Sequence, residues 1–198
     1  MGSLAEHIGY EPKDCRDVYG IINARQIKAL MFHSEMADMF GFLGLEGFKC
    51  MHEYQFLSES AGHRATKSYY LSHHDKILSD DEVKSIDIVP DDWTQYNRMD
   101  VTPNVRRQHT EKAMKEYVAW ETDTKEIYSE CASYFLAWHK IADFKRVQCL
   151  IEDVSCELKR LKELYLKLRA ADYSLDYIAT IQDELCCKYK CKSVAVED

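Results

Sequence analysis

One stretch of the chain, Gly47–Asp75, carries metal-capable side chains at the spacing of an α-helix. Residues three and four apart share a face of a helix, and here one such stripe consists of Phe48, His52, Gln55, Glu59, His63, Thr66 and Tyr70. Imidazole and carboxylate groups are ligands for divalent transition metals. The stripe therefore predicts one of two things. It is either a metal-binding face turned toward the protein interior, or a polar face turned toward solvent.

A further carboxylate occurs among apolar residues in the preceding segment. The density of apolar residues predicts a first helix over Val18–Leu43, in which Glu35 shares a face with Met31 and Met39. Burying a carboxylate there is costly unless the group is paired or binds an ion. Glu35 is therefore a candidate ligand, and His33 lies on the neighbouring face.

A glycine-rich run predicts where this first helix ends. Three of the seven glycines fall within Gly41–Gly47, and glycine in a helix interior costs about 1 kcal/mol relative to alanine. We expect the chain to reverse there and to continue as a second helix to about residue 78. A reversal centred near Gly47 would bring Glu35 level with Glu59, whereas one near Gly44 would place Ala29 opposite Glu59.

The rest of the chain predicts a long crossover followed by more helices. Residues 79–102 are acidic, contain Pro90, and are long enough to return the chain along a helix. Thr102 and Pro103 form a strong helix start, and no Gly or Pro follows Pro103. Two apolar seams follow, and their phase changes near residues 141–144. This predicts either two antiparallel helices, with Asp143 as the N-cap of the second, or one long bent helix.

The expected fold is all-α, a four-helix-bundle-like arrangement with one long crossover and a short fifth C-terminal helix, about residues 174–190. We expect a single helical domain over residues 1–198. Its parts are an N-terminal arm (1–17), a helical hairpin (18–78), an acidic crossover loop (79–102) and the long helices (103–198).

Several short motifs resemble the ferritin-like superfamily over about residues 25–165. Leu45–Phe48 with Glu59 and His63 resembles the second ferritin helix, and Asp87–Trp93 resembles the crossover. Ala119–Glu121 is similar to the third-helix metal motif. Residues 141–144 and 150–154 are similar to the fourth helix.

The resemblance implies a carboxylate-rich site for iron or another divalent metal in the bundle core. The matching positions are Glu35, Glu59, His63, Glu121 and Glu152. The chain departs from the family pattern in two ways. Glu59 and His63 are four residues apart, where the family motif has three. A turn at Ile141 would also set Glu152 level with Glu130, and not with Glu121.

Composition limits the classes of function. The net charge of −8 disfavours direct binding of nucleic acid or of an anionic membrane. No apolar run is long enough to span a bilayer, and the start of the chain lacks a signal-peptide pattern, so we expect a cytoplasmic protein. The eight cysteines are accordingly expected to be reduced.

A second reading assigns the protein to a different class. It is then a non-catalytic, acidic helical interaction protein, an inhibitor or adaptor that docks a basic, nucleic-acid-binding partner protein. The acidic residues proposed for that contact are Asp80, Asp81, Asp91 and Asp92. The heptad-like seams also suit self-association into a homo-oligomer.

Overall fold

The structure, a computed structural model, describes residues 11–80 and 100–193, with side chains described up to residue 190. Within these ranges the chain forms helices and no strand. The helices are α2 (Cys15–Phe42), α3 (Glu46–His74), α4 (Pro103–Ala137), α5 (Ile141–Ala170) and α6 (Leu175–Ser193). None of the helices in the described ranges is long and apolar enough to cross a membrane.

The reversal between α2 and α3 is centred on Gly44. The Leu45 N–H bonds the Phe40 carbonyl at 2.9 Å, and Gly44 has a φ of +71°. A residue with positive φ just past a helix end is the usual way to satisfy the last carbonyl groups, and glycine adopts it without strain. The alternative of a reversal centred near Gly47 is therefore wrong. Gly47 lies inside the first turn of α3.

Helix α4 begins where the sequence predicts it. The Thr102 side chain accepts a hydrogen bond from the Val105 N–H at 3.3 Å, and Pro103 occupies the first helical position. This is the N-cap and proline combination that starts helices most efficiently.

Two antiparallel helices, α4 and α5, follow, so the alternative of one long bent helix is wrong. The turn lies at residues 138–140, where His139 has a φ of +57°. Asp143 is not the N-cap of α5, because that position is Lys140, which makes no side-chain cap. Asp143 is buried, and it accepts hydrogen bonds from the Tyr19 hydroxyl at 3.0 Å and His74 Nε2 at 2.9 Å. It therefore ties α5 to α2 and α3.

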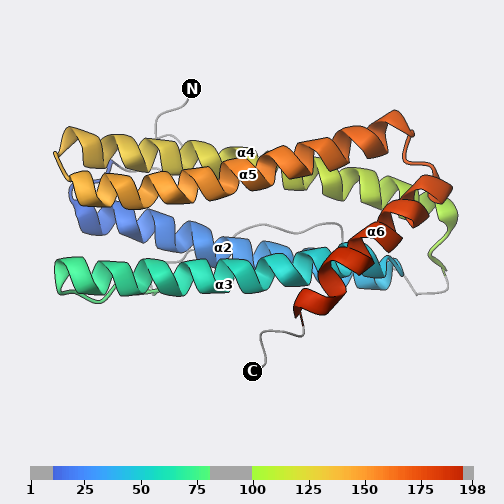
Figure 1. Cartoon of the computed structure of the whole chain (residues 1–198), viewed down its shortest axis with the longest axis horizontal. Helices are drawn as coiled ribbons and strands as arrows, with labels where there is room; N and C mark the ends of the chain where they lie inside the picture. The colour runs from blue at the N-terminus through green and yellow to red at the C-terminus, as the bar shows by residue number, and fades with distance from the viewer. Residues whose placement is uncertain (1–10, 81–99, 194–198) are drawn as a thin grey trace.

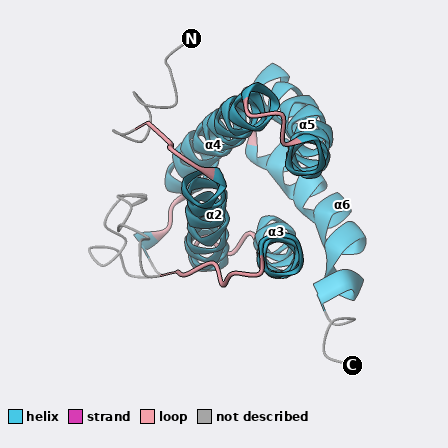
Figure 2. Ribbon diagram, turned by 90° about the vertical axis from the view of Figure 1, so that its left-hand side faces the viewer, coloured by secondary structure: helices cyan, strands magenta, loops and turns pink. Residues whose placement is uncertain are grey.

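The helices pack as two hairpins with a fifth helix across one of them. Helices α2 and α3 form one hairpin, α4 and α5 form the other, and α6 lies against α3 (Figure 1). Viewed along the bundle, α2 lies beside α4, while α3 and α5 stand apart (Figure 2). The expected all-α, four-helix-bundle-like fold with a C-terminal fifth helix is confirmed.

The apolar core is divided into two clusters, one at each end of the bundle. One surrounds Phe40 and Met114, and the other surrounds Tyr19 and Phe135. Between them each of the four long helices carries buried or mostly buried polar residues, which we call the polar layer: Arg25, Gln26, Glu59, Glu121 and Glu157. His33 borders this layer on α2. The fold thus gathers several ionisable groups, buried or mostly buried, at mid-bundle.

Candidate metal centre

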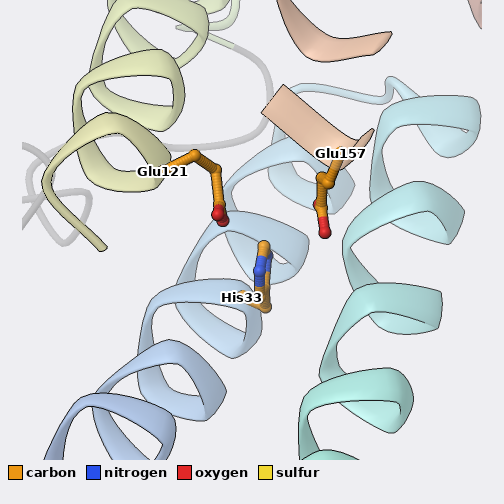
Figure 3. A group of neighbouring side chains, drawn as sticks. All are labelled: His33, Glu121 and Glu157. Carbon is orange, nitrogen blue, oxygen red and sulfur yellow. The ribbon is translucent and has the colours of Figure 1, made fainter. Parts of the chain in front are cut away.

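Three side chains converge at the polar layer from three different helices. His33 on α2, Glu121 on α4 and Glu157 on α5 each offer one ligand atom, and these atoms all lie within 4.8 Å of one another (Figure 3). His33 and Glu121 are buried, and Glu157 is mostly buried. Among the described residues, no other group of three His, Cys, Asp or Glu side chains is as close. This cluster is the candidate metal centre.

The His33 ring is held in a defined orientation. Its Nδ1 lies 3.0 Å from Nδ1 of His52 on α3, so one of the two nitrogens donates a hydrogen bond to the other. Its Nε2 is buried and has no hydrogen-bond partner among the described residues. Burial lowers the pKa of His33 to about 3, so the ring is neutral. A neutral imidazole whose Nδ1–H donates to a neighbour presents a lone pair at Nε2, as metal-binding histidines do.

Glu157 is held by two hydrogen bonds to one of its oxygens. The Tyr117 hydroxyl and the Gln55 amide both donate to Oε1, which leaves the second oxygen for an ion. Burial raises the pKa of Glu157, although the two hydrogen bonds and Arg160 oppose this. The carboxyl is thus oriented by α3 and α4 while it projects from α5.

Glu121 and Glu59 share this environment. The pKa of Glu121 lies well above its ordinary value because of burial first, and then because of the charges of Glu157 and Glu59. Burial, then Glu157 and Asp153, raise the pKa of Glu59 to about 7. Because the charges of Glu59 and of the other carboxyls affect one another's pKa, we count Glu59 on α3 as a fourth residue of the cluster.

The buried cation Arg25 lies beside these carboxyls, but its guanidinium is paired mainly with residues of α4. Arg25 forms an ion pair with Asp123 at 2.8 Å, donates to Thr124 Oγ1 at 2.8 Å, and lies 3.5 Å from the centre of the Trp120 ring. Arg25 lowers the pKa of Glu59 and Glu121 only in part. Arg25 therefore offsets only part of the cost of ionising the three carboxyls, and a divalent cation would offset more of it.

A groove between α3 and α5 leads to the cluster from outside. The cavity measures about 730 Å³, and Glu59, Glu157 and Tyr117 line it together with Leu185 and Tyr189 of α6. This volume is within the range of small-molecule sites. An ion in water can therefore reach Glu59 and Glu157 along the side of the bundle.

Of the five residues suggested by the ferritin resemblance, the structure places two at the cluster and three outside it. Glu121 belongs to the close group, and Glu59 lies beside it. Glu35, His63 and Glu152 lie outside that group. Glu35 is partly buried next to Asp38, which together with burial raises its pKa. Glu152 is exposed.

His63 has a different partner. Its Nε2 lies 3.5 Å from Asp80, a residue that also bonds Asn23 at 2.8 Å and Lys67 at 2.7 Å. Asp80 thus joins α2 to the C-terminal half of α3. The other acidic residues proposed for a partner contact, Asp81, Asp91 and Asp92, lie outside the described residues, as does the crossover motif Asp87–Trp93.

The position of the two turns explains the difference. A reversal at Gly44 sets His33 beside His52, so Glu35 is not opposite Glu59. A turn centred on His139 places Glu157 level with Glu121, as their proximity shows. Glu157 would have emerged from the sequence if this turn had been placed two residues earlier than Ile141.

No family model matches the chain, and no curated protein matches it. Among solved structures, the chain is similar to an engineered closed form of the Archaeoglobus fulgidus ferritin made by site-directed mutagenesis. The TM-score is 0.66 and the sequence identity 14%, and the match covers 89% of this chain and 96% of that chain. The chain has a ferritin-like fold.

Proposed function

We propose that this protein is a metal-binding ferritin-like bundle that holds one divalent ion, iron(II) or manganese(II). The ligands are His33 Nε2 and carboxylate oxygens of Glu121 and Glu157, with Glu59 at its edge. The observation that carries the proposal is the buried His33 Nε2, which has no hydrogen-bond partner in the described structure, beside two carboxyls of raised pKa.

The donor set fits such an ion. One imidazole nitrogen with carboxylate oxygens suits first-row divalent metals better than calcium or magnesium, which prefer oxygen alone. Two atoms on opposite sides of one ion, each at about 2.1 Å, are about 4.2 Å apart. The observed limit of 4.8 Å therefore asks for side-chain shifts of less than about 1 Å.

The surrounding residues have defined tasks in this proposal. His33 donates its Nδ1–H to His52 Nδ1, which leaves His33 Nε2 for the ion, and Tyr117 and Gln55 fix the rotamer of Glu157. An iron ion in such a site supplies one-electron redox chemistry, and the groove gives it contact with small molecules in solution. Arg25 limits the excess negative charge when the ion is absent.

The test compares two glutamates of the same helix. Full-length protein, stripped of metal, is titrated calorimetrically with manganese(II), and protein from iron-supplemented cultures is analysed for metal content. We expect about one ion per chain, with affinity reduced at least about tenfold in Glu157→Gln, because changing a residue that only supports a metal ligand already costs about tenfold or more. Glu152→Gln makes the same chemical change at an exposed position and should bind as the wild type does.

The same titration tests the remaining residues that the resemblance suggested. Glu121→Gln should weaken binding as Glu157→Gln does, and Glu35→Gln should not. Wild-type protein that contains no metal and takes up none would overturn the proposal. Equal effects of Glu152→Gln and Glu157→Gln would also overturn it.

A further inference from the structure

Helix α6 lies across α3 in a register that two contacts define. A Cβ built on Gly47 would overlap the backbone carbonyl of Gln182, so the two helices meet there without an intervening side chain. Further along, the rings of Tyr54 and Tyr189 have centroids 5.3 Å apart. Both pairs are separated by 135 residues in the chain. The two helices therefore run in the same direction over this contact.

This register brings two cysteines together. Cys50 lies between Gly47 and Tyr54 on α3, and the same offset places it opposite Leu185, the residue before Cys186 on α6. Both Cys50 and Cys186 are free thiols; Cys50 is buried and Cys186 partly exposed. Burial, then Glu46 and Glu53, and also Cys186 raise the pKa of Cys50, in agreement with the proximity that the helix register gives the two thiols.

We propose that Cys50 and Cys186 form a reversible disulfide that staples α6 to α3 when the protein meets a low-molecular-weight disulfide such as oxidised glutathione. A disulfide needs Cα atoms within about 7 Å and Cβ atoms that face each other. The close approach at Gly47, one turn before Cys50, gives the helices that proximity. The proposal does not depend on metal binding.

The exposures of the two thiols set the order of the exchange. The Cys186 thiolate attacks one sulfur of oxidised glutathione, forms a mixed disulfide, and releases one glutathione thiolate. The Cys50 thiol then loses its proton to water, and its sulfur attacks Cys186 Sγ. The second glutathione leaves as a thiolate. Two protein thiols are thus oxidised and one glutathione disulfide is reduced to two thiols.

Cys187 provides a matched control on the same helix. It is exposed, so a small disulfide reaches it as readily as it reaches Cys186. It lies about 100° further around α6, away from Cys50. Reaction at Cys187 should therefore stop at the mixed disulfide with glutathione.

The experiment maps the disulfides in the full-length protein after incubation with oxidised glutathione. Non-reducing proteolysis and mass spectrometry should recover a peptide linking Cys50 to Cys186, with Cys187 carrying glutathione. Cys187→Ser should leave the crosslink intact. The oxidised chain should unfold roughly 5–15 °C higher than the reduced one, because the disulfide closes a long loop.

Two results would overturn the staple. One is a Cys50 that stays reduced while Cys186 is fully glutathionylated. The other is a crosslink of the same yield in Cys50→Ala, which would show that Cys186 pairs elsewhere. Because the mapping is done on the wild-type chain, it does not depend on whether Cys50→Ala folds.

Discussion

Replacing Glu59 with glutamine should stabilise the metal-free protein at neutral and higher pH. In the folded chain burial and two neighbouring carboxylates raise the pKa of Glu59 from 4.5 to about 7. Between these two values the folded chain keeps a proton that the unfolded chain has lost. Ionised Glu59 therefore destabilises the wild-type protein. This destabilisation is absent below pH 4.5, grows from pH 4.5 to 7, and is complete above pH 7.

The size of the effect follows from the two pKa values. A change from 4.5 to about 7 corresponds to about 3 kcal/mol of destabilisation once the group is fully ionised. From pH 5 to pH 8 the stability difference between Glu59→Gln and wild type should grow by about 2.5 kcal/mol at most. Water in the groove screens part of this, so we expect a growth of about 1 to 2.5 kcal/mol.

The assay is urea unfolding of both proteins in chelator-containing buffer at pH 5 and pH 8, followed by circular dichroism. Taking the difference between the two proteins cancels the contribution of the histidines to the pH dependence. The charged groups around position 59 are the same in both proteins: Arg25, Glu121, Asp153 and Glu157. Glu152→Gln controls for the loss of one negative charge. A difference between Glu59→Gln and wild type that stays within about 0.5 kcal/mol from pH 5 to pH 8 would refute the reasoning.

Other changes test the fold and the metal centre separately. Gly47→Ala should lower stability by about 2 to 4 kcal/mol, since its Cβ would displace Gln182 and with it α6; thermal unfolding checks this. Asp143→Asn should lower the free energy of unfolding by about 1 to 3 kcal/mol, because it weakens the buried hydrogen bonds that include His74. An unchanged free energy in urea unfolding would contradict this prediction. Thr102→Ala should cost about 1 kcal/mol through loss of the N-cap. Metal affinity should fall as the pH drops below 7, because protons compete for the carboxylates, and calorimetry at pH 5.5 and 7.5 measures it.

The fold was largely predictable because its signals are local. Gly44 ends α2 because it adopts a positive φ, and Thr102 with Pro103 starts a helix whatever it packs against. The turn at His139 has no such mark. A histidine adopts a positive φ there, at a cost that the packing of α4 on α5 offsets. No residue type in this segment predicts the turn.

The candidate site was less predictable because it depends on the turns to within one or two residues. Each residue adds about 1.5 Å along a helix, so a two-residue error in the centre of a turn changes the residue opposite by four positions, which is about 6 Å or one helical turn. Glu121 was predicted from the local motif Ala119–Glu121, which does not depend on the turns. Glu157 and His33 were not predicted as ligands, since their roles arise only from the registers of α4 with α5 and of α2 with α3.

The groove between α3 and α5 has a consequence for the residence time of a bound ion. Because Glu59 and Glu157 line a cavity that opens along the flank of the bundle, an ion there would leave without any helix separating from another. Its dissociation rate would be set by its own ligand bonds, while the fold around it stays closed. A chelator in solution should therefore remove the ion much faster than the protein unfolds.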